Sequence, residues 1–167
     1  CLKGWLAKYA VGLILACPYP MVAMGAELPD YLSAGARPLE VFKSPSCGCC
    51  NDWIAHAEQK GFLVESSHPT SLAALKRQLG IKLRYQSCHT TVAENGFVFE
   101  GHIPIKLVTQ FLDNPPDEAV GLAVPGMPVG SPGMEVGDKF MPYQVLLLKR
   151  DGSHEIYAYI SRPEQQY

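Results

Sequence analysis

The segment Cys47-Gly48-Cys49-Cys50 places three thiols within four residues and holds the densest reactive chemistry in the chain. Thiolates attack disulfides and bind soft metal ions, so the segment predicts either electron exchange or metal coordination. Cys47 and Cys50 have the C-x-x-C spacing, which puts both on one face of the first turn of a helix. They could therefore form a redox-active disulfide or chelate one ion, and Cys49 adds a third thiol.

Further candidate ligands lie outside this segment. Cys88-His89 joins a thiol to an imidazole, and His102 follows a predicted strand. Met127 and Met134 belong to two identical Pro-Gly-Met units of a long loop. Thiolate and thioether sulfur together select Cu(I), whereas Cys and His alone satisfy zinc. The methionines therefore favour copper, with a structural zinc site as an alternative. Burial in the core is the competing interpretation for the lone cysteine and for the methionines.

The predicted elements place the thiols at the start of a helix. A strand over residues 39–43 precedes the cysteines and a helix over residues 51–60 follows them, closed by Gly61. Unpaired amide groups at such a helix start favour the thiolate form. Downstream, the pattern predicts a strand (62–65), a helix (72–79), a hairpin (90–94 and 97–100) with a type I′ turn at Asn95-Gly96, a helix (105–112), a Gly/Pro-rich loop (123–141) and a last hairpin (143–149 and 156–159).

This order of elements predicts an α/β, thioredoxin-like fold, in which a mixed sheet is flanked by helices and the C-terminal β-hairpin is an addition. The reactive cysteines of that fold lie at the start of the first helix, where Cys47 and Cys50 stand. Thioredoxin-like enzymes normally keep a proline before the facing strand, but this chain has Cys88-His89-Thr90 there. The presence of Cys88 and His89 where a proline is usual predicts metal ligands in place of a peptide-docking site. A thiol-disulfide oxidoreductase that uses Cys47 and Cys50 without a metal stays an alternative.

The N-terminal residues predict export. Residues 1–26 combine two lysines, a short apolar run and small residues near Ala26, as a secretory signal does, and a lipoprotein anchor at Cys17 is a lesser alternative. The chain begins at Cys1 without a methionine, so we expect the true start to lie upstream. Residues 27–38 are expected to form a linker and residues 39–160 one domain.

The charge balance excludes some partners. The formal net charge is -2 and no basic run is present, which argues against nucleic acid and against an anionic membrane surface. After signal removal we therefore expect a monomeric periplasmic protein without membrane contact.

Four separated motifs resemble one known family, the CopG-type periplasmic copper-resistance proteins, a metal-binding family long carried as a domain of unknown function. The resemblance covers about residues 39–159, and its motifs are residues 43–50, 87–90, 100–104 and 121–135. It implies a thioredoxin-like fold, other periplasmic copper-handling proteins as partners, and a copper site, for which a multinuclear cluster and a role in copper redox chemistry have been proposed. Carried over to this chain, its metal-binding positions are Cys47, Cys49, Cys50, Cys88, Met127, Met134 and, more weakly, His102. Enzymatic turnover, with Cys47 and Cys50 as the redox pair, is left open.

Overall fold

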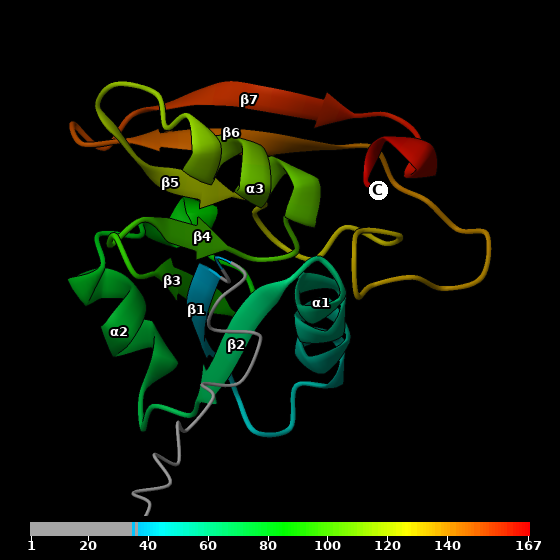
Figure 1. The fold of residues 1–167 in the computed structure, drawn as a ribbon, viewed down its shortest axis with the longest axis horizontal. Coiled ribbons are helices and arrows are strands. Elements are labelled where there is room, and N and C mark those ends of the chain that lie inside the picture. The colour runs from blue at the N-terminus through cyan, green and yellow to red at the C-terminus, as the bar shows by residue number, and fades with distance from the viewer. Residues whose placement is uncertain (1–34, 36) are drawn as a thin grey trace, which may run out of the picture.

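Seven strands form one mixed sheet in the part of the chain that the computed structural model describes, which is residue 35 and residues 37–167 (Figure 1). The sheet order is β2-β1-β3-β4-β5-β6-β7, with parallel pairing in β1–β2 and β4–β5 and antiparallel pairing elsewhere. The strands are β1 (Arg37–Phe42), β2 (Phe62–Ser67), β3 (Thr90–Ala93), β4 (Val98–Glu100), β5 (Ala119–Ala123), β6 (Tyr143–Lys149) and β7 (His154–Ile160). The α-helices are α1 (Gly48–Gln59), α2 (Leu72–Gln78) and α3 (Ile105–Asp113), and short 3-10 helices span Leu83–Tyr85 and Pro163–Gln165.

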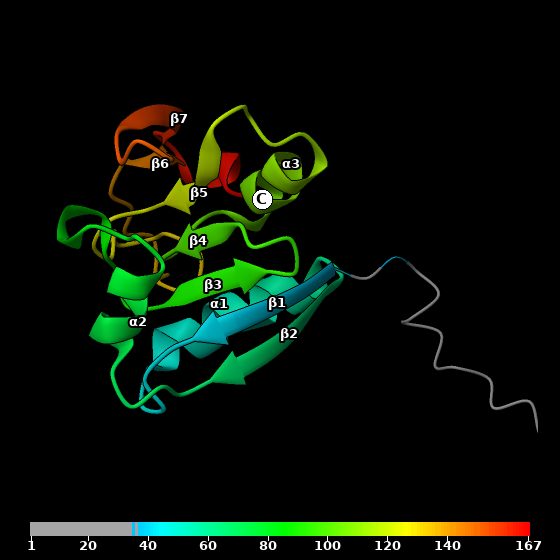
Figure 2. The same cartoon turned by 90° about the vertical axis from the view of Figure 1, so that its left-hand side faces the viewer.

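Helices cover both faces of the sheet, which confirms the predicted thioredoxin-like layout. Trp53 of α1 and Phe111 of α3 share one apolar core with Phe99 of β4. In Figure 2, which is turned by 90° from Figure 1, α1 lies behind β1 and β3. Successive strand residues point to opposite faces, so Val98 joins a second apolar cluster while Phe99 joins the first. On that second face, buried Lys76 of α2 reaches the sheet at Glu100.

The helix ends carry local sequence signals, although α1 begins earlier than predicted. Cys47 is the N-cap of α1, so the helix begins three residues before the predicted start and takes Cys49 and Cys50 into its first turn. Gly61 follows the end of α1 with a φ of 86°, as a helix-terminating glycine does. Ser71 caps α2, its side chain accepting a hydrogen bond from the amide of Ala74 at 3.2 Å. The sequence therefore specifies where the cysteine-bearing helix sits.

The predicted turn at Asn95-Gly96 is wrong in type. The β3–β4 hairpin forms, and the amide of Gly96 donates to the carbonyl of Ala93 at 2.8 Å. A type I′ turn needs positive φ at both central residues. Gly96 has a φ of 84°, but Asn95 is not among the described residues with positive φ. Glu94 and Asn95 therefore occupy the centre of the turn, and the glycine follows it.

The sequence prediction missed β5. This strand is short, contains Gly121 and is buried between β4 and β6, so it shows no polar–apolar alternation. Because β5 pairs with both β4 and β6, the C-terminal hairpin of β6 and β7 continues the main sheet.

The structure describes the C-terminal residues of the chain but not residues 1–34 and 36. The predicted signal in residues 1–26 and the lipoprotein alternative at Cys17 lie outside the described residues, as does most of the predicted linker; Arg37 and Pro38 belong to β1. At the other end, Gln166 is buried and its amide donates to the carbonyl of Gly130 at 2.8 Å. Within the described part of the chain, every helix is too short or too polar to cross a lipid bilayer.

Candidate metal centre

Two remote segments bring four cysteines together where α1 and β3 begin. The Sγ atoms of Cys50 and Cys88 are 3.6 Å apart, and those of Cys47 and Cys49 are also 3.6 Å apart. All four sulfur atoms lie within 4.8 Å of one another. The fold thus supplies the close sulfur group that a soft metal ion needs.

In this structure Cys47 and Cys50 form a disulfide, with Cα atoms 5.4 Å apart. Cys49 and Cys88 are the free thiols of the described residues. The C-x-x-C spacing therefore does permit the redox disulfide expected of it. Since the thiolate is the metal ligand, coordination by all four cysteines requires this disulfide to be reduced first.

Cys88 also belongs to a second group, which contains two histidines. Its Sγ lies 3.0 Å from Nε2 of His102 and 3.4 Å from Nδ1 of His89, and the three ligand atoms lie within 4.8 Å of one another. Nδ1 of His102 lies 2.7 Å from the carbonyl oxygen of Pro132. A carbonyl only accepts, so Nδ1 carries the proton and Nε2 presents its lone pair towards Cys88. Backbone carbonyls fix metal-binding histidines in this way.

Burial keeps both imidazoles neutral. His89 is fully buried, with its ring centroid 4.8 Å from that of Trp53 and 4.9 Å from that of His102. Burial, and then the charges of His102, Lys76 and Lys43, lower the pKa of His89 well below its usual value. Burial also lowers the pKa of His102, although its hydrogen bond to Pro132 acts in the opposite direction. Nε2 of His89 has no hydrogen-bond partner in the described structure. Neutral imidazole is the form that binds metals.

The thiol of Cys88 holds its proton strongly. Burial, and then the nearby Cys49, raise the pKa of Cys88 from its usual 9.0 to about 11. At neutral pH this group is therefore a thiol that can donate to Nε2 of His102. A metal ion that binds here must displace that proton, so its affinity depends on pH.

The two Pro-Gly-Met units lie against different cysteine segments. In the first unit the amide of Gly126 donates to the carbonyl of Gln86 at 3.2 Å, next to the Cys88 segment, and Met127 is 53 % exposed. In the second unit Gly133 packs so closely on α1 that an added Cβ would lie 2.6 Å from the carbonyl oxygen of Cys49. Met134, the next residue, is half-buried. The loop thus lies against both cysteine segments.

The sequence analysis did not predict a buried polar cluster of Lys76, Thr90 and Glu100, which contacts the Cys88 segment through Ser87. Glu100 of β4 is fully buried, pairs with Lys76 of α2 and accepts a hydrogen bond from the hydroxyl of Thr90 at 2.6 Å. A signal was present, since Glu100 occupies an inward position of β4 in line with Val98. A buried carboxylate at such a position requires partners.

Comparison with known proteins identifies the relatives of this chain. A family model described as protein of unknown function, DUF411, matches residues 85–134. Two solved structures of the copper resistance protein CopG are 41 % identical to the chain. Form 2 has a TM-score of 0.71 and the match covers 75 % of this chain and 98 % of that one; for form 1 the values are 0.69, 74 % and 96 %. No curated protein sequence matches.

The match to CopG extends over nearly the whole length of the solved chains, and the residues matched by the family model include Cys88, His89, His102 and both Pro-Gly-Met units. The family predicted from the four motifs is confirmed: the chain belongs to the family of the copper resistance protein CopG.

Proposed function

We propose that this protein binds copper as Cu(I) and protects the periplasm by sequestering it. Its ligands are the thiolates of Cys47, Cys49, Cys50 and Cys88, the imidazoles of His89 and His102, and the thioethers of Met127 and Met134. The observation that carries the proposal is the convergence of four cysteine sulfurs within 4.8 Å, with Nε2 of His102 3.0 Å from the Cys88 sulfur. Sulfur with neutral imidazole suits Cu(I), and the similar solved structures are named for copper resistance.

The two ligand groups support more than one copper ion. One group holds the four cysteines, the other holds Cys88, His89 and His102, and Cys88 belongs to both. A thiolate has several lone pairs and can bridge two ions. We therefore propose a multinuclear site in which Cys88 would be a ligand shared by the four-cysteine group and the histidine group.

The disulfide supports a redox step at the same site. When reduced, Cys47 and Cys50 together release two protons and two electrons as their S–S bond forms. Two Cu(II) ions accept one electron each and become Cu(I), which the remaining sulfur and imidazole ligands retain. A dithiol reductant would return the pair to two thiols. The motivating observation is the Cys47–Cys50 disulfide beside two free thiols.

A chelator competition tests copper binding directly. Reduced protein would compete anaerobically for Cu(I) with a chromophoric chelator, as wild type and as the variants Cys47→Ser and Cys88→Ser. Loss of one ligand thiolate is expected to weaken binding by more than about tenfold. Ser46→Ala is the matched control, because Ser46 is exposed beside the motif and lacks sulfur. Unchanged affinity in both cysteine variants would contradict the proposal.

A thiol-disulfide oxidoreductase is the second candidate, and the Cys47–Cys50 disulfide at the start of α1 favours it. This activity needs no thioether. Insulin reduction that is unaffected by Met127→Leu and Met134→Leu, in a protein that does not retain Cu(I), would establish it in place of copper binding. Retention of zinc through purification, with unfolding after chelation, would instead indicate a structural zinc site.

A further inference from the structure

We propose that Glu100, charge-balanced by Lys76, is a positioning residue that holds Cys88 and His89 in place for metal binding. The inference rests on the proposed function, since it assigns a role in the same site to a residue pair that contains no soft ligand. Glu100 touches neither sulfur nor imidazole of the two ligand groups; it acts through the backbone and side chains on either side of Cys88-His89.

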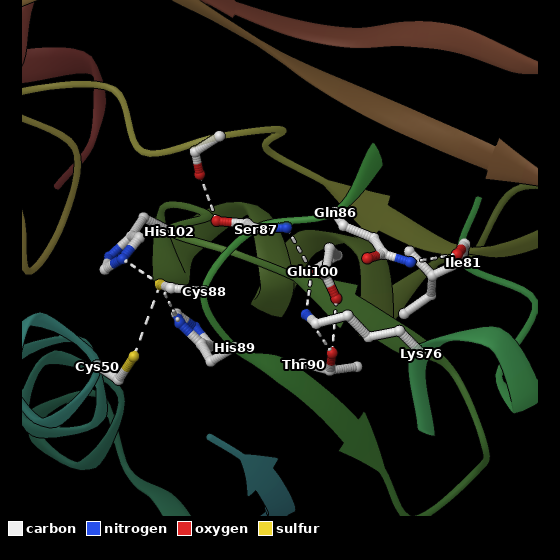
Figure 3. A network of polar contacts seen from close by, with 11 residues as sticks. Cys50, Lys76, Ile81, Gln86, Ser87, Cys88, His89, Thr90, Glu100 and His102 are labelled. Atoms are coloured by element: carbon white, nitrogen blue, oxygen red, sulfur yellow. Dashed lines mark hydrogen bonds and ion pairs between the residues drawn. The ribbon is translucent and has the colours of Figure 1, made fainter. Parts of the chain in front are cut away.

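The carboxylate of Glu100 accepts hydrogen bonds from the residues on both sides of Cys88-His89 (Figure 3). Its Oε1 accepts a hydrogen bond from the amide of Ser87 at 2.6 Å, immediately before Cys88. Its Oε2 accepts from the hydroxyl of Thr90 at 2.6 Å, immediately after His89. One carboxylate therefore fixes the residue on each side of Cys88-His89.

Lys76 of α2 holds the same carboxylate and Thr90, and we call the Lys76–Glu100 pair the clamp. Its ammonium group pairs with Oε1 of Glu100 and donates to the hydroxyl of Thr90 at 2.9 Å. The side chains of Lys76 and Glu100 are only 4 % and 0 % exposed. Buried ion pairs often stabilise a fold no better than apolar side chains of similar size. A pair at this depth is therefore better explained by the geometry it imposes on its neighbours.

The clamp also sets the distance between Cys88 and His102. Glu100 ends β4 two residues before His102, so a single short segment carries both the carboxylate and the imidazole. The amide of Gly101 between them donates to the carbonyl of His89 at 3.0 Å. Holding Ser87 and Thr90 against this segment keeps the Cys88 sulfur 3.0 Å from Nε2 of His102.

A double-mutant cycle tests the proposal. The variant Lys76→Met/Glu100→Leu removes both charges together, so neither is left buried alone. In the wild-type background we expect Cu(I) affinity to fall about 10- to 100-fold, the usual effect of losing a group that orients ligands. In a Cys88→Ser background the same pair of changes should cause a smaller further loss, because one of the two ligands that the pair positions is already gone. Arg37→Met/Asp113→Leu, which removes an exposed ion pair in the fold, is the control and should leave affinity unchanged.

A second measurement does not depend on copper. Alkylation of the Cys88 thiol in the metal-free, disulfide-containing full chain, followed by mass spectrometry of its peptide, should be faster in Lys76→Met/Glu100→Leu than in wild type. If that variant fails to fold, Thr90→Val gives the same test with a near-isosteric change. The positioning role would be overturned by equal alkylation rates. It would also be overturned if the pair of changes caused the same loss of affinity in the wild-type and the Cys88→Ser backgrounds. A wild-type protein that binds no Cu(I) would instead refute the proposed function, while the alkylation rates would still decide the clamp.

Discussion

The two Pro-Gly-Met units have the same sequence but different surroundings. An added Cβ on Gly126 of the first unit would meet open space, and Met127 is exposed. An added Cβ on Gly133 of the second would lie 2.6 Å from the carbonyl oxygen of Cys49 and 2.7 Å from the amide nitrogen of Trp53. The second glycine is thus required for the approach to α1, whereas the first occupies free space.

This difference separates a prearranged ligand segment from an adaptable one. The carbonyl of Pro132 orients His102, and Gly133 fixes the second unit against the cysteine helix. The first unit is held through Gly126 to Gln86 and Ser87, and its Met127 is about half exposed. Ligands fixed before binding lose less conformational entropy when the ion arrives. We therefore expect the second unit to contribute more to Cu(I) affinity and the first unit to take part in the capture or release of copper.

Paired glycine substitutions give the largest expected effect. Gly126 and Gly133 both have positive φ, 71° and 83°, so Ala at either site strains the backbone by about 1 to 2 kcal/mol. Gly133→Ala adds a clash with the backbone of α1, which raises its total to about 3 kcal/mol or more. Chemical denaturation of both variants would measure the difference in the free energy of unfolding. Equal losses would show that the close packing of Gly133 has no energetic importance.

Paired methionine substitutions test the same comparison at the metal. Leucine conserves the volume of methionine but removes the thioether, so stability should change little. We expect Met134→Leu to weaken Cu(I) binding about tenfold, as for loss of a neutral ligand near a soft ion. Met127→Leu should weaken it less, because Met127 is about half exposed. A larger effect at Met127 would reverse the roles assigned to the two units.

The fold could be predicted wherever the chain carries local signals. The end of α1 at Gly61 and the hairpin across Asn95-Gly96 were located because helix ends and turns depend on neighbouring residues. The strand β5 could not be found, since its pattern is decided by burial between β4 and β6. The turn type was missed because Gly96 alone adopts positive φ, leaving Asn95 in an ordinary conformation.

The site was predictable as a set of residue types but not as an arrangement. Thiols and imidazoles identify soft-metal chemistry directly, which is why Cys88 and His102 could be selected. The tautomer of His102 depends on the carbonyl of Pro132, 30 residues away in the chain. The Lys76–Glu100 pair likewise joins α2 to β4, which only the tertiary structure brings together.

Ser87→Ala tests how the first unit is held. The hydroxyl of Ser87 donates to the carbonyl of Gly126, and alanine removes this bond while leaving the Ser87 amide bond to Glu100 intact. We expect a loss of about 1 kcal/mol in unfolding free energy and faster hydrogen exchange around Met127. Exchange around Met134 is the internal control and should not change. Equal acceleration at both methionines would mean that the loop moves as one body.

The smallest expected effect is on the pKa of Cys88, whose segment is bonded to the first unit through Gln86 and Ser87. Burial is the main cause that raises its pKa to about 11, and Cys49 is the second. Cys49→Ser should therefore lower the pKa of Cys88, yet leave it above the usual 9.0, because burial remains. Ultraviolet titration of the thiolate in the disulfide form would measure the shift.

The raised pKa of Cys88 also fixes how its protonation affects stability. Because the folded protein holds this proton more tightly than the unfolded chain, the contribution of Cys88 to the free energy of unfolding is complete below pH 9.0 and is lost as pH rises towards 11. A Cys88 pKa unchanged by Cys49→Ser would show that the two thiols are electrostatically independent, and would weaken the case that one metal site unites the cysteine helix with the histidine side.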